Sequence, residues 1–298
     1  MDRDHCAQLS RELGEPLAGT APVVRGWIAL EHPGPWTRKA PTEVEIGTLA
    51  TSLDVDGVRV QLIRPIQHLH VPLPQPTGHT VLLAHAGVDP ADRWMERLVV
   101  ADLADLADVD PSVVLSPVAP GLGEPVKRDV WLVCAHSRRD ACCAVRGRPV
   151  AAALDAAGIE VWETTHTGGH RFAATAVLLP DGLSLGHLDT VDAVGVARDL
   201  AAGGLPTDLL RGRCALPRPA QAAEVALRQR IGATGREDVV PQGVTDADGH
   251  AIVTLSAGDD VWTCRVRVRP ASPPRPVSDG ADPTAPDTYL VEDLHLVE

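Results

Sequence analysis

Apolar runs separated by proline- and glycine-rich breaks divide the first part of the chain into short strands and helices. The run VRVQLIR at 58–64 ends at Pro65 and is typical of a buried strand. Thr42, followed by acidic residues, predicts the start of a helix that extends to about Asp54. The other elements predicted in this region are strands at 26–31, 80–84 and 98–100 and helices at 7–13 and 101–107. This β-α-β-β-β order predicts a small α/β layer domain over residues 1–120.

A second unit is predicted over residues 128–205, after a Pro- and Gly-rich linker at 116–127. Its continuously apolar first strand is typical of a strand buried on both faces of a sheet, and Pro149 is expected to delay the helix that follows. The predicted elements are a strand at 130–133, a helix at 141–157, a strand at 159–165, a hairpin of 176–179 and 183–185, and a helix at 190–202. This connectivity is that of a thioredoxin-like domain.

Residues 206–298 have a different pattern and are predicted to form a smaller α+β region. A helix is expected at 220–231, and the strands and loop that follow are expected at 252–256, 262–269, 271–286 (a proline-rich loop) and 289–297. The whole chain is therefore predicted as an α/β protein. Its thioredoxin-like domain would be preceded by a small α/β domain and followed by this C-terminal region.

The composition limits the classes of function. With 298 residues, 44% of them hydrophobic, the chain is long enough for two or three domains with a sizeable core. Its net charge of −13 disfavours nucleic acid and anionic membranes as partners. The charge either favours a basic partner, such as a redox protein or reductase with a basic docking face, or serves only to keep the protein soluble. No window approaches the roughly 20 apolar residues of a membrane span. The charged N-terminal segment does not resemble a secretory signal, so a cytoplasmic protein is expected.

Two cysteines and two histidines follow the first two strands of the second unit. Cys134 comes directly after the first strand and His166 directly after the second, and Cys143 and His170 give the spacings C-x8-C and H-x3-H. Loops at the carboxyl ends of neighbouring strands lie together in an open α/β sheet and are where ligands collect. The pattern therefore predicts a metal or iron–sulfur site. Three cysteines within ten residues also indicate metal or redox chemistry rather than a disulfide framework.

The longer motifs around these residues are similar to those of a known family. C-x-H-x-x-R-D-x-x-C at 134–143, followed by H-x-G-G-H-R-F-A at 166–173, resembles the sucrase/ferredoxin-like family, a branch of the thioredoxin-like [2Fe-2S] ferredoxins. The resemblance extends over at least residues 1–189. It implies a [2Fe-2S] cluster held by two cysteines and two histidines, which by position are Cys134, Cys143, His166 and His170. Cys142 competes as a ligand, although the spacing from the first cysteine favours its neighbour.

This ligand set implies electron transfer rather than catalysis. Thiolate and imidazole both suit iron, and two histidines on one iron are the arrangement of Rieske centres. Such centres have potentials of about −150 to +300 mV, against about −400 mV for plant-type ferredoxins, so we expect a potential above the all-cysteine value. A histidine ligand can also lose a proton on oxidation, which would couple reduction to protonation.

Neighbouring residues are expected to support the ligands. Gly168 and Gly169 allow the backbone to approach a cluster closely and leave N–H groups free for its sulfides, or they simply form a turn. Arg139 and Asp140 are expected to pair and fix the first loop. His136, two residues after the first cysteine ligand, is expected to contact the ligands from outside.

Two other functions are compatible with the sequence. H-x3-H is half of a two-cysteine, two-histidine zinc finger, but C-x8-C and the long gap between the pairs do not fit one. A thioredoxin-like thiol oxidoreductase would use Cys142 or Cys143, but the chain has no C-x-x-C motif. Hydrolysis of sucrose, which the family name suggests, needs two placed carboxylates, and no such pair stands out.

Overall fold

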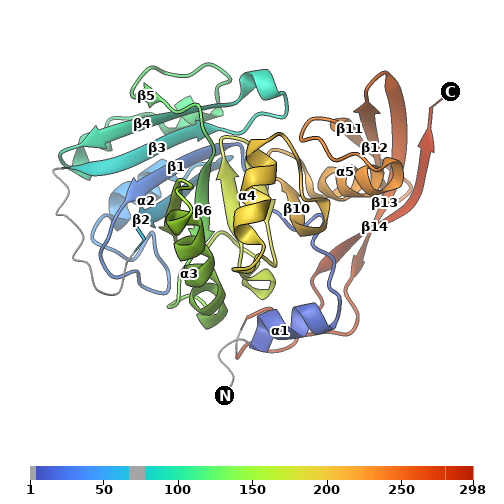
Figure 1. The fold of residues 1–298 in the computed structure, drawn as a ribbon, viewed down its shortest axis with the longest axis horizontal. Helices are drawn as coiled ribbons and strands as arrows, with labels where there is room; N and C mark the ends of the chain where they lie inside the picture. The colour runs from blue at the N-terminus through green and yellow to red at the C-terminus, as the bar shows by residue number, and fades with distance from the viewer. Residues whose placement is uncertain (1–4, 67–77, 279, 298) are drawn as a thin grey trace.

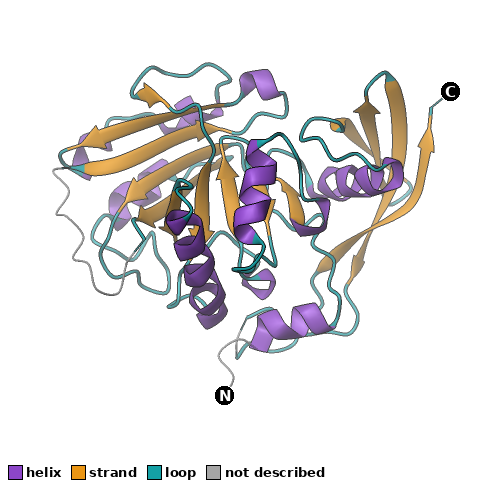
Figure 2. Ribbon diagram, in the orientation of Figure 1, coloured by secondary structure: helices purple, strands orange, loops and turns teal. Residues whose placement is uncertain are grey.

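The structure, a computed structural model, describes residues 5–66, 78–278 and 280–297 and has a mixed α/β fold (Figures 1 and 2). Its strands are β1 (Gly26–Glu31), β2 (Val58–Arg64), β3 (His79–His85), β4 (Trp94–Val100), β5 (Glu124–Pro125), β6 (Val130–Cys134), β7 (Val161–Thr164), β8 (Ala176–Leu179), β9 (Leu183–Leu185), β10 (Leu210–Arg213), β11 (Val240–Ala247), β12 (His250–Ala257), β13 (Asp260–Pro270) and β14 (Asp287–Leu296). Its α-helices are α1 (His5–Glu12), α2 (Gly47–Leu53), α3 (Ala141–Ala156), α4 (Ala193–Ala201) and α5 (Arg218–Ile231). The short 3₁₀ helices are η1 (Pro90–Asp92), η2 (Leu103–Leu106), η3 (Pro111–Leu115), η4 (His170–Phe172) and η5 (Thr207–Leu209).

A large mixed sheet contains strands β1 to β10 in the order β10-β9-β8-β6-β7-β2-β1-β3-β4-β5. Its first half (β1–β5) and second half (β6–β10) each contain a parallel pair, β1–β2 and β6–β7. Three more strands follow from the first member of that pair, each antiparallel to the one before it: β3, β4 and β5 in the first half, and β8, β9 and β10 in the second. The halves meet where β2 and β7 pair antiparallel through Arg64 and Glu163. The predicted units 1–120 and 128–205 therefore share one sheet, and β10, from the third predicted region, extends it.

Alternate residues of the central strands face opposite sides of this sheet. Trp131 and Val133 of β6 pack with Leu154 of α3 in one buried cluster, and α3 and α4 cover this face of the second half in Figure 1. On the opposite face, Leu132 belongs to a cluster that also contains Trp27 of β1. The apolar run at 130–133 is continuous because β6 is buried on both faces, and one core crosses the junction between the halves.

The C-terminal region forms a separate antiparallel sheet in the order β11-β12-β13-β14. Leu227 of α5 packs against this sheet through Val253 and Val266, and Figure 1 shows the sheet beside the second half. Strand β11 is not predicted from the sequence because most of its residues are exposed, so that it lacks the alternation of a half-buried strand. Within the described part of the chain, no helix has the length and apolar content that crossing a bilayer requires.

Two predicted helix starts differ from the structure. Helix α3 begins at Ala141 and carries Pro149 in its interior, because the Asp140 side chain caps its first turn. The carbonyl that Pro149 leaves without an N–H donor belongs to Val145, which is 48% exposed and can bind water instead. Thr42 is not a helix cap: its hydroxyl donates to a nearby carbonyl, and α2 begins only at Gly47.

Candidate metal centre

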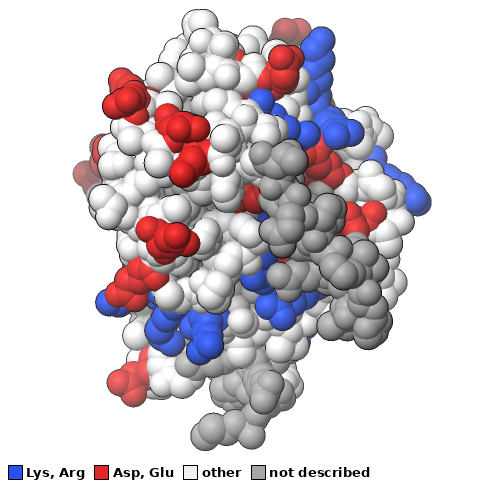
Figure 3. Space-filling view, turned by 90° about the vertical axis from the view of Figure 1, so that its left-hand side faces the viewer, with Lys and Arg blue, Asp and Glu red and all other residues white. Residues whose placement is uncertain are grey.

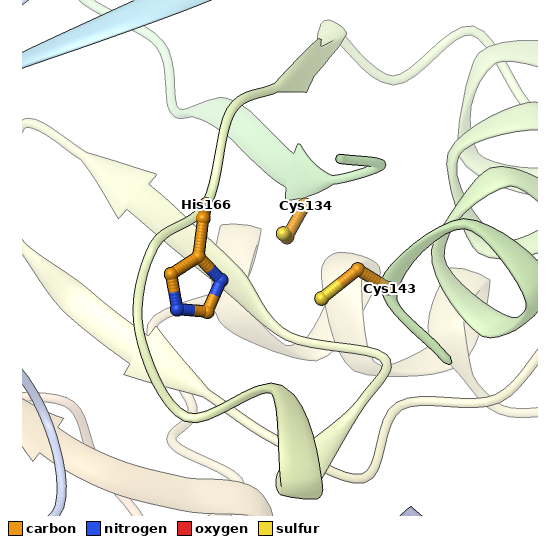
Figure 4. Close-up of side chains that lie close together, drawn as sticks. All are labelled: Cys134, Cys143 and His166. Carbon is orange, nitrogen blue, oxygen red and sulfur yellow. The ribbon is translucent and has the colours of Figure 1, made fainter. Parts of the chain in front are cut away.

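The ends of β6 and β7 bring predicted ligands to one edge of the large sheet. Cys134, the last residue of β6, lies beside Thr164, the last residue of β7, in parallel register. His166 follows on the next loop, and the first turn of α3 supplies Cys143. A nitrogen of His166 and both sulfurs lie within 4.8 Å of one another, and Figure 4 shows the three side chains pointing toward a common space. The structure thus brings three of the four predicted ligands together.

The two sulfurs of this group differ in acidity. A hydrogen bond from the Cys143 thiol, assisted by the His166 ring, lowers the pKa of Cys134 although burial opposes the shift. Donating that hydrogen bond raises the pKa of Cys143, and burial adds to the effect. The two side chains are only 0% and 1% exposed. Cys134 is therefore the sulfur best prepared to be a thiolate, which is the form of cysteine that binds metals.

His170, the fourth predicted ligand, contacts His166. The Nδ1 atom of His170 lies 3.3 Å from His166 Nε2, and its Nε2 atom lies 3.6 Å from a carboxylate oxygen of Asp140. Burial, followed by the neighbouring charge of His166, lowers the pKa of His170 to about 4, so the ring is neutral at pH 7. Two ring nitrogens, His166 Nδ1 and His170 Nε2, are buried without a hydrogen-bond partner among the described residues. Neutral imidazole with a free nitrogen is the form that ligates metals.

Cys142 lies in a second group of side chains and not beside Cys134. Its sulfur is 2.7 Å from Asp140 Oδ1, 3.5 Å from Cys6 Sγ and 3.1 Å from the carbonyl oxygen of His170. The hydrogen bond with its neighbour Cys143, together with burial and the Asp140 carboxylate, raises the pKa of Cys142. Cys142 is therefore held as a thiol that donates hydrogen bonds. Cys6, Asp140 and Cys142 could also hold an ion, since their donor atoms lie within 4.8 Å of one another.

His136 fixes the loop that carries His166. Its Nε2 atom lies 2.7 Å from the carbonyl oxygen of Thr37, and its Nδ1 atom accepts a hydrogen bond from the His166 backbone N–H at 3.3 Å. Burial lowers the pKa of His136, which keeps the ring neutral with its proton on Nε2. Trp36 packs edge-on against the imidazole at 5.9 Å between ring centres. A loop from the first half of the sheet thus positions a predicted ligand in the second half.

Gly168 and Gly169 form a turn over the guanidinium group of Arg211. Their φ angles are +90° and +70°, which other residues rarely adopt. A Cβ on Gly169 would lie 2.5 Å from Arg211 Nη2, and Arg211 Nη1 donates to the Gly168 carbonyl at 3.0 Å. Burial lowers the pKa of Arg211 to about 9. The backbone conformation and the guanidinium group therefore require glycine here, and a role of the N–H groups toward a cluster stays a prediction.

The predicted pair of Arg139 with Asp140 is not formed. Arg139 makes no ion pair with any residue that the structure describes, and its side chain lines a pocket beside His166. Asp140 points inward as the cap of α3, where it accepts hydrogen bonds from the Cys142 N–H at 3.2 Å and from the Ser278 hydroxyl at 2.8 Å. The Asp140 carboxylate points inward because it caps α3 and accepts a hydrogen bond from the buried Cys142 thiol.

Segments near both ends of the chain close the site. Helix α1 brings Cys6 against α3, and the loop between β13 and β14 brings Ser278 to the same place. Glu15 joins these segments, because it accepts from Arg171 at 2.6 Å and from Arg275 at 2.5 Å. These two guanidinium groups lower the pKa of Glu15, although burial opposes them. Sequence reasoning missed these residues because Cys6 and Ser278 lie 136 and 138 positions from their contacts, with no local motif to connect them.

The sequence of the chain matches the model of a known protein family. The family model described as sucrase/ferredoxin-like matches residues 17–212, which include most of the large sheet and all four predicted ligands. No curated protein and no solved structure matches the chain.

Proposed function

The chain belongs to the sucrase/ferredoxin-like family, and from this premise we propose that it is an electron-transfer protein carrying a [2Fe-2S] cluster. The proposed ligands are Cys134, Cys143, His166 and His170. The observation that carries the proposal is the group of two buried sulfurs and one imidazole nitrogen within 4.8 Å at the ends of two parallel strands. Sulfur and imidazole together are the donors that iron–sulfur and zinc sites use.

The protonation states and spacing of the donors support this ligand set. Cys134 has a lowered pKa, and His170 is neutral, so neither donor must lose a tightly held proton before it binds a metal. The nitrogens of His166 and His170 are 3.3 Å apart. Two nitrogens on one tetrahedral metal, with bonds of about 2.0–2.1 Å, would be about 3.4 Å apart. These nitrogens are His166 Nε2 and His170 Nδ1, so binding of one iron by both histidines, as in Rieske centres, would replace the hydrogen bond between the two rings, and the cluster would supply one-electron transfer.

We further propose that the second half of the sheet is a thioredoxin-like ferredoxin domain. The chain order β6-α3-β7-β8-β9-α4 and the sheet order β7-β6-β8-β9 support this assignment. The parallel pair β6–β7 places its two carboxyl ends side by side, and the proposed ligands follow these ends. The fold would then have the role of holding four donors from three separate segments in one place.

The exposure of the donors indicates the route of electron exchange. Cys134 and Cys143 are buried, whereas the His170 side chain is 12% exposed. Electrons would therefore leave through the histidine edge, where a proton can also be exchanged with water. A thiol oxidoreductase is disfavoured, because a disulfide substrate cannot reach a buried sulfur. We propose a redox protein as partner and a reducing compartment such as the cytoplasm, where the six free cysteines would stay reduced.

A single zinc ion is the second candidate, and the compactness of the three donors favours it. Two zinc–sulfur bonds of about 2.3 Å place the sulfurs about 3.8 Å apart. The donors of Cys134, Cys143 and His166 lie within 4.8 Å of one another, which accommodates such an ion. His170 or a water molecule would then complete the coordination.

Metal and sulfide analysis of protein purified without oxygen separates the candidates. The cluster predicts two irons and two sulfides per chain, visible charge-transfer bands and an EPR signal after reduction. His166→Cys and His170→Cys should each keep a cluster but lower its potential, because each exchange adds a negative ligand. A colourless protein with one zinc per chain would overturn the cluster. A midpoint potential that is constant between about pH 6 and 10 would exclude proton exchange at the histidines.

A further inference from the structure

A basic pocket of about 480 Å³ opens beside His166. Its wall contains four cationic side chains, and Asp54 is the one acidic residue among the described residues that line it. The cations are Arg38, Lys39, Arg59 and Arg139. The formal charge of this lining is therefore four minus one, or +3, in a chain whose net charge is −13. Figure 3 likewise shows groups of Lys and Arg on one face of this acidic molecule.

Three of these cations have no carboxylate partner within the described part of the chain. Lys39 pairs with exposed Glu43 at 2.8 Å. Arg38, Arg59 and Arg139 form no ion pair with any residue in the described ranges. Surface arginines without partners are common when they extend into water, but these three border one concave space. A pocket with low-dielectric walls concentrates their field and attracts a small anion.

Arg59 is the best-placed of the three because its guanidinium group is fixed. Its Nη2 atom donates to the backbone carbonyl of His166 at 2.8 Å. Its Nε atom lies 2.7 Å from the side-chain oxygen of Gln61, in the amide orientation that satisfies both groups. Burial lowers the pKa of Arg59, and the Asp54 carboxylate opposes this shift only in part. A fixed guanidinium group binds planar or tetrahedral oxyanions well, since its donors are already oriented.

We propose that this pocket binds a small molecule that carries phosphate groups. The lining carries more positive charge than a ligand with one carboxylate group would neutralise. The volume of the pocket suits a nucleotide-sized ligand. The site depends on the arginines and not on a bound metal. Resting on the proposed function, the ligand would lie against His166, at the histidine edge through which electrons leave. The negative net charge predicts a protein partner with a basic docking face. That prediction concerns the surface of the molecule as a whole and not this basic pocket.

Calorimetric titration of the full-length protein with inorganic phosphate and with pyrophosphate tests the proposal. We expect saturable binding of one equivalent, tighter for pyrophosphate, and weakened by added NaCl. Arg139→Gln and Arg38→Gln should each weaken binding about tenfold or more, which is the usual cost of one charge-assisted hydrogen bond. Arg59→Gln should have the largest effect. Arg230→Gln, on an exposed part of α5 remote from the pocket lining, is the matched control and should bind as the wild type does.

The outcomes separate this site from the proposed cluster. Binding is measured on protein of known iron and zinc content, so pyrophosphate binding by iron-free protein would support the pocket even where the cluster proposal fails. Arg59→Gln also removes a hydrogen bond to the His166 loop, so the test rests on Arg38 and Arg139 if that variant does not fold. Equal affinities of the wild type, Arg38→Gln and Arg139→Gln would overturn the site, as would absence of saturable binding. Citrate binding as tightly as pyrophosphate would overturn its assignment to phosphate.

Discussion

The two halves of the large sheet have the same plan but different residues at the strand ends. The order β2-β1-β3-β4-β5 in the first half corresponds to β7-β6-β8-β9-β10 in the second, and the halves meet antiparallel at β2–β7. Strand β1 ends at Glu31, where β6 ends at Cys134. Two residues beyond β2 is Ile66, and two residues beyond β7 is His166. The plan thus creates two similar positions, and among the described residues a group of metal-binding donors is found at the second of them and not at the first.

The first half supports the candidate centre instead of duplicating it. Glu31 accepts a hydrogen bond from the Thr80 N–H at 2.8 Å and so completes its own sheet. Thr37 and Arg59, also from the first half, contact the second: one accepts from the His136 ring, and the other donates to the carbonyl of His166. Strand topology supplies the place for a site, whereas the side chains decide whether that place binds a ligand or supports a neighbouring site.

Substitutions at the corresponding strand ends of the two halves should give the largest difference in metal content. Cys134→Ser should abolish binding of iron and zinc, because it removes the thiolate at the centre of the donor group. Glu31→Gln, at the corresponding strand end, keeps an acceptor for Thr80 and should leave metal content unchanged. Mass-spectrometric metal analysis together with the visible spectrum measures both. Equal loss of metal in the two variants would mean that a change at either strand end disrupts the fold. It would not support Cys134 as a ligand.

The adjacent cysteines of α3 provide a second contrast within the same measurement. Cys143→Ser should lose metal as Cys134→Ser does, whereas Cys142→Ser should retain it, because the Cys142 thiol donates to Asp140. The opposite result would transfer the ligand role to Cys142 and to the group that contains Cys6.

The junction between the halves should give the next largest effect. Arg64 donates to Glu163 Oε2 from Nη2 at 2.6 Å and from Nε at 2.8 Å, and both side chains are buried. Glu163→Leu should lower the free energy of unfolding by about 3–5 kcal/mol, because it leaves the guanidinium group buried and unpaired. Glu43→Leu, which breaks the exposed pair with Lys39, should cost far less, because water solvates both charges when they separate. Urea denaturation measures both, and similar losses would show that the junction pair is not desolvated.

The features that sequence predicts here are local, and those it misses depend on how elements face one another. The apolar run of β6 and the spacing from Cys134 to His166 lie within short segments, so the strand ends and their donors could be placed in advance. The choice between Cys142 and Cys143 could not be settled, because adjacent residues of a helix differ by about 100° in direction and both are buried in α3. The contact of Cys6 with α3 depends on chain segments that only the tertiary fold brings together.

Removal of a helix cap should change the free energy of unfolding by a smaller amount. Asp140 caps α3, whereas Ile46 precedes α2 and provides no side-chain cap. Asp140→Ala should lower the free energy of unfolding by about 2–3 kcal/mol, since it removes a cap and leaves the Cys142 thiol and the Ser278 hydroxyl without their acceptor. Asp110→Ala, at the exposed cap of η3, should cost clearly less, because water can replace the hydrogen bonds of an exposed cap. Equal costs in urea denaturation would show that burial of the Asp140 contacts contributes nothing.

The last contrast concerns the residue two positions beyond the fourth strand of each half, Asp102 after β4 and His187 after β9. Asp102 is an exposed cap, whereas burial, followed by the charge of Arg11, lowers the pKa of His187 to about 4. The unfolded chain, with a histidine pKa of about 6.5, then binds a proton before the folded protein does. Stability is therefore fully present above about pH 6.5 and declines as the pH falls toward 4, by about 1–2 kcal/mol after allowance for solvent screening. His187→Asn, a residue that tolerates the φ of +56° at this position, should remove this share of the acid sensitivity in urea titrations between pH 7 and 4. An unchanged pH profile would show that His187 is already protonated in the folded protein or equally shielded after unfolding.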